Sequence, residues 1–149
     1  MINFNWLYRF LVSLKLAYDT FLLKISEGRI SFDDTRDLLK EYAFVGNIRI
    51  SDNFFTLANK DNMVKLVSLS PVRFRRYQKE IYDCDDFSFT FMGLYRFLIP
   101  NFAVGIIWSR THAYNFFIDS DRNVWGVEPQ SNKVFRIVDK KEDIQLMII

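Results

Sequence analysis

The sequence predicts an α+β domain in which helices come first and an antiparallel β-sheet follows. Three observations indicate this fold class. Apolar residues recur at spacings of three and four in the first 24 residues, and again between residues 84 and 98. Four β-rich runs, separated by polar turns, then fill residues 103–138. Helices that precede a block of strands, rather than alternating with strands, are typical of the α+β class.

The composition is that of one globular domain covering residues 1–149. Half of the 149 residues are hydrophobic, which is enough for a packed core at this length. The net charge is only +2, so we expect no nucleic-acid partner. The one basic cluster, "RFRRYQK" at residues 73–79, is interpreted as a solvated helix face. A single cysteine cannot form an internal disulfide, and this favours a reducing compartment such as the cytoplasm.

The first 24 residues predict an amphipathic helix within a helical N-terminal subregion, residues 1–45. We expect its apolar face to be buried against the rest of the domain, although an aromatic helix of this kind could also bind a protein partner or a membrane surface. The segment lacks the positive start and cleavage site of a signal peptide. Arg9, Lys15 and Asp19 interrupt it, so we expect no membrane span.

Two further helices are predicted before the cysteine. Asp33 or Asp34 is expected to cap a helix through "TRDLLKEYAF", residues 35–44. Residues 47–72 mix apolar and polar residues, and this stretch could hold short strands or irregular loop. Pro71 is expected to open a short helix through "VRFRRYQKEI", residues 72–81, since proline suits the first helical position.

The second half of the chain is easier to interpret. Asp83 stands where an N-cap is expected, which places Cys84 in the first turn of a helix that ends before Pro100. Four strands should follow as an antiparallel meander. They are "AVGIIWS" from residue 103, "HAYNFFID" from 112, "NVWGVEP" from 123 and "KVFRIV" from 133.

The only cysteine, the only histidine and one glutamate occupy positions that suit a thiol nucleophile. Cys84 opens a helix, His112 opens the second strand and Glu128 ends the third. A nucleophilic thiol needs a base to accept its proton and a third group to orient that base. The pattern therefore predicts a Cys84–His112–Glu128 triad. The alternative for each residue is structural: a buried cysteine, a surface histidine and an ordinary strand end.

Three aspartates flank the cysteine in "YDCDDF" and oppose formation of a thiolate. The positive end of the helix dipole and an imidazolium opposite the thiol would act in the other direction. We therefore expect Asp85 and Asp86 to point away from the sulfur. A second acidic run, "DSDRN" at residues 119–123, opens like a calcium loop but has Val124 and Gln130 where such a loop needs Gly and Glu, so it is interpreted as a hairpin turn.

The length of that turn decides whether His112 and Glu128 share a face of the sheet. A two-residue loop would place Glu128 opposite Asn115 and turn His112 to the other face. A three-residue loop at 119–121 would place His112 directly opposite Glu128, and a bulge at Gly126 would have the same effect on parity. We predict an odd-length loop or a bulge.

The blocks "YDCDDFSF", "AVGIIW", "HAYNFFID" and "VWGVEPQ" resemble papain-like cysteine peptidases. They are closest to the papain-like C-terminal domain of a fungal agglutinin and to related small domains encoded by bacteriophages. The resemblance covers about Phe54 to Ile137. It implies a papain-like fold, with the helices packed on the meander, and a catalytic triad of Cys84, His112 and Glu128.

The resemblance also bears on function. It implies a thiol hydrolase that cleaves an amide bond in a peptide or protein substrate, in the host cytoplasm if the chain is phage-encoded. The agglutinin domain is a calcium-dependent protease, so the resemblance implies that calcium is a possible cofactor. No full set of metal ligands can be assembled from the sequence, and we expect that no cofactor is required. The alternative is a non-catalytic papain-like binding protein, such as a phage-encoded inhibitor of a host factor.

Overall fold

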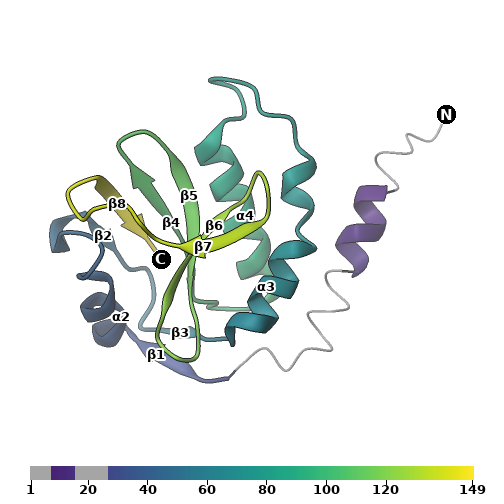
Figure 1. Ribbon diagram of the computed structural model, residues 1–149. Helices are drawn as coiled ribbons and strands as arrows, with labels where there is room; N and C mark the ends of the chain where they lie inside the picture. Colours follow the sequence, from purple (N-terminus) through teal and green to yellow (C-terminus); the bar gives the residue numbers. More distant parts are fainter. Residues whose placement is uncertain (1–7, 16–26) are drawn as a thin grey trace.

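The structure is a computed structural model that describes residues 8–15 and 27–149. Helices and sheets are both present, so the predicted α+β class is confirmed. The main sheet has six strands in the order β2-β8-β4-β5-β6-β7, and a second sheet pairs β1 (Arg29–Ser31) with β3 (Phe54–Thr56). Figure 1 shows α3 and α4 on one side of the main sheet and α2 near its other side.

The predicted meander forms the centre of the main sheet. β4 (Val104–Ser109), β5 (Ala113–Ile118), β6 (Val124–Glu128) and β7 (Lys133–Arg136) pair in sequence, each antiparallel to the next. Every residue of β5 is buried, as expected for a central strand covered on both faces. The four predicted runs match these strands closely because alternation and turn residues are local signals.

Two strands extend the sheet beyond the meander. β8 (Ile144–Ile148) pairs antiparallel with β4, and β2 (Ile48–Arg49) pairs parallel with β8. β8 was not predicted from the sequence, and β2 lies in the stretch that could hold either short strands or loop. β2 has only two residues, and β8 pairs with positions about 40 residues away in β4. No local sequence pattern therefore predicts either pairing.

Each face of the sheet covers its own hydrophobic cluster. On one face, α3 (Lys60–Ser68) and α4 (Cys84–Leu98) pack on the sheet through Leu66, Phe91 and Tyr95, against Phe117 and Val127. The other face carries a second cluster, in which α2 (Phe32–Leu39) and the small sheet contribute side chains. Its members include Ile30, Leu39, Phe55, Ile107, Tyr114, Phe116 and Ile118. Burying each large apolar side chain contributes about 1.5–3 kcal/mol, so both clusters hold the helices to the sheet.

The helices before residue 70 differ from the prediction. α2 begins at Phe32, because the Ser31 hydroxyl accepts a hydrogen bond from the Asp34 backbone N–H at 3.1 Å. The predicted aspartate cap was wrong, since Asp33 and Asp34 lie inside the first turn, and the helix ends at Leu39. α3 was not predicted from the sequence. Its N-cap is Asn59, followed by a single helical stretch of nine residues.

The basic cluster does not form the helix face that the sequence suggested. Only Pro71–Phe74 is helical, as the short 3-10 helix η2. Residues 75–83 make a turn in which Gln78 and Tyr82 exchange two backbone hydrogen bonds, at 2.9 and 2.8 Å. Glu80 has a φ of 60° there, a left-handed conformation that a helix does not allow. The helix predicted through residue 81 is therefore wrong.

The N-terminal helix is described only over residues 8–15, and the rest of the predicted helix lies outside the described residues. The Arg9 guanidinium donates to the Phe74 carbonyl at 2.8 Å, and the Tyr8 ring meets the Phe74 ring edge-on. Phe10 and Leu14 remain about half exposed, at 48% and 51%, so the expected burial is only partial. No helix among the described residues is long and apolar enough to cross a membrane.

Candidate functional site: a cysteine and a histidine–glutamate pair

The cysteine opens α4, as the sequence predicted. Asp83 is the N-cap and Cys84 is the first helical residue. The Asp86 carboxylate accepts a hydrogen bond from the Asp83 backbone N–H at 3.1 Å, which fixes the start of the helix. Asp86 therefore points into a backbone amide, as expected. The helix ends at Leu98, just before Pro100.

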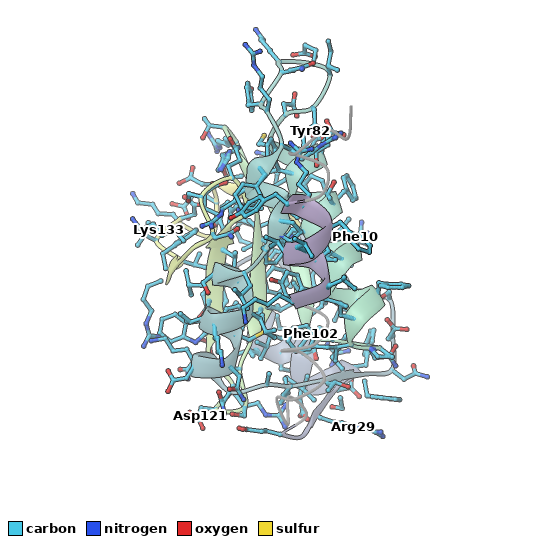
Figure 2. All side chains as sticks on the ribbon, turned by 90° about the vertical axis from the view of Figure 1, so that its right-hand side faces the viewer. Phe10, Arg29, Tyr82, Phe102, Asp121 and Lys133 are labelled. Carbon is cyan, nitrogen blue, oxygen red and sulfur yellow. The ribbon has the colours of Figure 1, made fainter. Side chains whose placement is uncertain are left out.

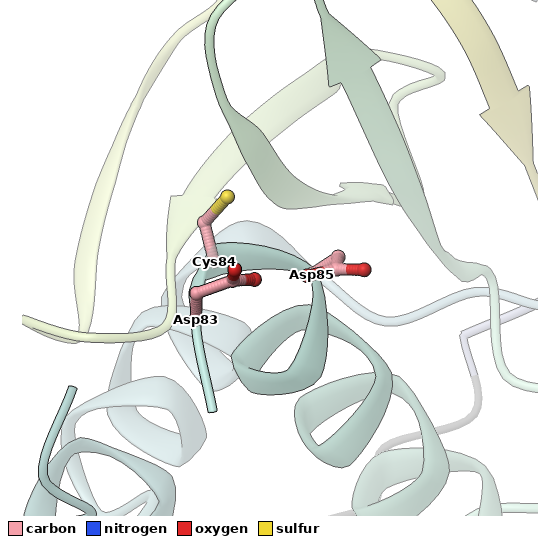
Figure 3. A group of neighbouring side chains, drawn as sticks. All are labelled: Asp83, Cys84 and Asp85. Atoms are coloured by element: carbon pink, nitrogen blue, oxygen red, sulfur yellow. The ribbon is translucent and has the colours of Figure 1, made fainter. Parts of the chain in front are cut away.

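The thiol of Cys84 is half buried and lies beside two carboxylates. Figure 3 shows the sulfur pointing away from the helix while the Asp83 carboxylate turns towards Asp85. One ligand atom from each of these three residues lies within 4.8 Å of the others. Asp85 was expected to point away from the sulfur; the structure instead keeps it in this cluster.

The two carboxyl groups share a hydrogen bond, which moves their pKa values apart. This hydrogen bond raises the pKa of Asp85 and lowers the pKa of Asp83. Repulsion between the two carboxylates acts in the same direction on Asp85, because it disfavours the second negative charge.

The histidine and the glutamate form a direct pair. The Nε2 of His112 and the Oε2 of Glu128 lie 2.6 Å apart, within hydrogen-bond distance. The other carboxylate oxygen of Glu128 accepts the Gln130 backbone N–H at 3.1 Å. Both oxygens of the carboxylate are thus held. The hydrogen bond to Glu128 raises the pKa of His112, and the nearby Asp139 charge adds to this, while burial acts in the opposite direction.

A tight turn fixes the backbone of His112. The Ser109 backbone N–H donates to the His112 carbonyl at 2.9 Å, and the Ser109 hydroxyl accepts the His112 backbone N–H at 3.2 Å. On the ring side, His112 stacks on Tyr114 with 6.1 Å between the ring centroids. The Tyr114 hydroxyl donates to Asp139 at 2.6 Å. The imidazole therefore has a defined position from both its backbone and its neighbours.

The hairpin between His112 and Glu128 has the predicted parity but a different register. Ile118 pairs with Val124, and the Asp119 backbone N–H donates to the Asn123 carbonyl at 3.0 Å, which leaves a three-residue loop at 120–122. The loop is odd, as predicted, but lies one residue later than expected. Extending this register places Glu128 opposite Tyr114, so His112 and Glu128 are diagonal neighbours on one face rather than direct partners.

The alternative prediction, a β-bulge at Gly126, is wrong. Gly126 pairs regularly with Phe116 on one side and with Phe135 on the other. A Cβ added at Gly126 would lie 2.5 Å from the Phe135 ring, so glycine makes room for this ring. The interpretation of "DSDRN" as a hairpin turn is confirmed, because the Asp119 carboxylate accepts from the Asn123 backbone N–H at 2.8 Å and from the Trp125 indole at 2.7 Å.

One buried amide joins the cysteine helix to the histidine strand. The side chain of Asn115 donates to the carbonyls of Ser88 in α4 and Gly105 in β4, at 2.9 and 3.0 Å. Further along, Phe91 of α4 and Phe117 of β5 belong to one cluster, so the helix and the strand run in the same direction. The start of α4 and the start of β5 consequently lie at the same end of the sheet.

The structure brings His112 and Glu128 together, while their contact with Cys84 stays a prediction. The His112 ring stacks on Tyr114, which belongs to the cluster on the face away from α4. The thiol takes part in no hydrogen bond within residues 8–15 and 27–149. A contact between the sulfur and the imidazole would therefore lie past the strand ends, beside the residue before β5 and the first residue of α4.

The residues around the thiol do not fit a calcium ion. In proteins, calcium takes roughly six to eight oxygen ligands. The cluster at Asp83, Cys84 and Asp85 offers two carboxylates and one sulfur. The carboxylates also share a hydrogen bond with each other.

Sequence reasoning missed several residues that hold the site. Ser109 fixes the turn before His112, the Gln130 backbone N–H holds Glu128, and Asp139 acts on His112 from beyond β7. Pro129 and Gln130, which follow β6, are a local signal for a turn that could cap the glutamate. No sequence pattern near His112 predicts the role of Asp139, because Asp139 is placed near the histidine by its hydrogen bond with Tyr114.

Comparisons with known proteins show likeness in fold alone. No family model matches the chain, and no curated protein matches its sequence. A solved structure of a PSL1a–E64 complex matches with a TM-score of 0.62 and 19% identity, covering 81% of this chain and 50% of that one. Polyporus squamosus lectin bound to the human-type influenza-binding epitope Neu5Aca2-6Galb1-4GlcNAc matches with a TM-score of 0.63 and 20% identity, covering 81% and 49%.

These neighbours bear on the resemblance seen in the sequence. A fungal lectin agrees with the resemblance to a fungal agglutinin, whereas nothing in the comparisons shows a papain-like peptidase. The chain spans about half the length of the structures that it matches, so the likeness concerns that half.

Proposed function

We propose that the protein is a thiol hydrolase of papain-like type that cleaves an amide bond in a peptide or protein. The observation that carries this proposal is the hydrogen bond between His112 and Glu128, at 2.6 Å. A carboxylate that orients an imidazole and raises its pKa prepares it to accept a proton from a nucleophile. The one cysteine of the chain begins the helix that starts at the same end of the sheet.

The roles of the three residues follow from their contacts. Nε2 of His112 is engaged with Glu128, which leaves Nδ1 for the thiol proton. The Cys84 sulfur attacks the amide carbon, and His112 passes the thiol proton to the leaving nitrogen as the carbon–nitrogen bond breaks. Water, deprotonated by His112, then attacks the thioester, releases the acid and restores the thiol. Glu128 stabilises the imidazolium that forms in each half of the cycle.

A donor for the developing oxyanion is present at the same place. The backbone N–H of Cys84 has no hydrogen-bond partner among the described residues, since it lies in the first turn of α4. A helix N-terminus also favours negative charge. The Cys84 N–H is therefore suited to hold the carbonyl oxygen of a substrate. The free thiol would stay reduced in the cytoplasm, where we place the protein.

The rate of thiol alkylation tests the proposal before any substrate is known. We expect iodoacetamide to label Cys84 stoichiometrically at about pH 6, faster than it labels free cysteine, because His112 favours the thiolate. His112→Ala should slow the labelling at least about tenfold. E64, which is present in the complex of one fold neighbour, is a second probe. A wild-type rate at or below that of free cysteine, unaffected by His112→Ala, would reject the thiol site.

The second candidate is a non-catalytic binding protein, and the comparisons favour it. One fold neighbour is a lectin solved with a bound glycan, and the Cys84 thiol makes no hydrogen bond in the described part of the chain. This candidate predicts slow alkylation that does not depend on His112. It also predicts binding of a ligand that is retained in Cys84→Ala, and titration with Neu5Acα2-6Galβ1-4GlcNAc is the first such measurement.

A further inference from the structure

Three arginines line one pocket near the start of α4. The pocket has a volume of about 300 Å³ and is lined by Arg9, Arg75, Arg76, Gln78, Ile81 and Tyr82. Arg9 comes from the N-terminal helix, and the others come from the turn between η2 and α4. Figure 2 shows the N-terminal helix, in purple, below Tyr82. The pocket thus joins two segments that are about 65 residues apart in the sequence.

The positive charge in this pocket has no counter-charge among the residues that the structure describes. No carboxylate is among the lining residues, and none of the three arginines forms an ion pair with another described residue. Like charges gathered in one concavity repel each other. Such an arrangement is stabilised when an anion enters, because each guanidinium can donate two parallel hydrogen bonds to it.

Two of the arginines are held in place by contacts that leave N–H groups for a ligand. One nitrogen of Arg9 donates to the Phe74 carbonyl at 2.8 Å. The Arg75 guanidinium lies over the Tyr82 ring, 4.7 Å from its centroid, an arrangement that uses the face of the guanidinium rather than its edge. Arg76 makes no hydrogen bond or ion pair with a described residue. Preorganised donors lower the entropy cost of binding.

An apolar pocket continues from the charged one. It has a volume of about 230 Å³, shares Arg9 and Arg75 with the first pocket, and is otherwise lined by Pro71, Val72, Thr90 and Leu94. A ligand that fills both needs a strongly anionic group joined to a small apolar body. A single carboxylate is matched by one guanidinium, whereas a phosphate monoester carries about two negative charges and three acceptor oxygens.

We propose that Arg9, Arg75 and Arg76 form a binding site for a phosphate monoester whose organic group occupies the adjoining apolar pocket. The site does not involve Cys84, His112 or Glu128, so it stands whether or not the protein is a hydrolase. It also gives a role to the basic cluster, which the structure shows in a turn rather than on a helix face.

Calorimetric titration with phenyl phosphate tests this site, with inorganic phosphate and benzoate as comparison ligands at the same ionic strength. We expect phenyl phosphate to bind several-fold more tightly than inorganic phosphate, because its ring buries apolar surface, and more tightly than benzoate. Arg76→Gln should weaken phenyl phosphate binding about tenfold. Arg75→Gln should weaken it to a similar degree. Cys84→Ala should bind like the wild type.

Lys79→Gln is the matched control, because Lys79 is an exposed cation of the same turn that does not line either pocket. It should change the affinity less than about twofold, as screened surface charges do. The proposal is overturned if Lys79→Gln weakens binding as much as Arg76→Gln, if benzoate binds as tightly as phenyl phosphate, or if the wild type binds neither phosphate ligand. Circular dichroism of each variant confirms that the fold is kept.

Discussion

The two halves of the candidate site differ in how firmly the protein holds them. The His112–Glu128 half is fixed by several hydrogen bonds: Ser109 holds the backbone of the histidine, and both oxygens of the glutamate have partners. The Cys84 half has a well-defined backbone but a thiol without a hydrogen-bond partner in the described part, next to a carboxylate pair. The imidazole is held by defined contacts, while the sulfur has no hydrogen bond that fixes it among the described residues.

This difference follows from where each half lies in the fold. Glu128 ends β6 and His112 lies directly before β5, so the pairing of these two strands sets both positions together. Cys84 belongs to a helix whose link to that sheet depends on packing and on the Asn115 amide. A site divided in this way is sensitive to anything that shifts the helix against the sheet, because a misplacement of about 1 Å can cost about a hundredfold in rate.

Cys84→Ala should have the largest effect, and only on chemistry. If the site is hydrolytic, the rate should fall at least about a thousandfold, as for removal of a nucleophile. The melting temperature should change by less than about 2 °C, since a half-buried thiol without hydrogen bonds contributes little packing. Thermal denaturation and a hydrolysis assay check the two parts. A drop of many degrees would show instead that the cysteine is part of the core.

Asn115→Ala should break the link between the halves and cost stability. The free energy of unfolding should fall by about 2–4 kcal/mol, because the carbonyls of Ser88 and Gly105 lose their donor in a buried place. Urea denaturation measures this. Asn132→Ala, which removes a partly exposed amide that donates to Ser70 at 3.0 Å, is the control and should cost about 1–2 kcal/mol, part of it because Asn132 has a φ of 57° that alanine adopts less readily.

The same Asn115 variant separates the halves functionally. The pKa of His112 should be unchanged, since its contacts lie within the sheet, whereas the alkylation rate of Cys84 should change. Equal effects of Asn115→Ala and Asn132→Ala on both stability and alkylation would show that the amide does not position the helix.

Glu128→Gln should have a moderate effect on the histidine half. The pKa of His112 should fall towards its ordinary value, because the carboxylate that raises it is removed. The single histidine of the chain gives one imidazole signal, so proton NMR during a pH titration follows it directly. Any hydrolytic rate should fall about tenfold or more, since the amide still orients the ring but stabilises the imidazolium less.

The stability effect of the pair has a defined pH dependence. A histidine whose folded pKa is raised stabilises the fold fully below its unfolded pKa of about 6.5, and this stabilisation is lost as pH rises through the folded value. The stability difference between wild type and Glu128→Gln should therefore be larger at about pH 5.5 than at about pH 9. Denaturation at the two pH values measures this stability difference. An equal difference at both values would show that the His112–Glu128 ion pair does not stabilise the fold.

Asp85→Asn should have the smallest effect. Asp85 is only partly buried, so the free energy of unfolding should change by less than about 0.5 kcal/mol. The amide can still donate to Asp83, while one potential negative charge near the sulfur is removed. Alkylation of Cys84 at about pH 6 should rise by no more than a few-fold. A loss of alkylation would instead assign Asp85 a positive role at the thiol.

Much of the fold around the site could be predicted because its signals are local. The N-cap at Asp83, the helix that Cys84 begins and the four strands of the meander depend on residues that are near each other in the sequence. The odd-length loop was also predictable, since only that parity puts His112 and Glu128 on one face. The cap of α2 was missed because Ser31 and the two aspartates are all good N-caps, and packing selected Ser31.

The sequence by itself determined which residue types stand at the ends of which elements, and so proposed Cys84, His112 and Glu128 as one group. Tertiary structure decided the rest. It set the diagonal register of His112 and Glu128, paired β8 with β4 across about 40 residues, and brought Arg9 to the arginines of the turn before α4. These outcomes depend on contacts between distant segments, whose free energy comes from burial in the assembled core and leaves no periodic trace in the chain.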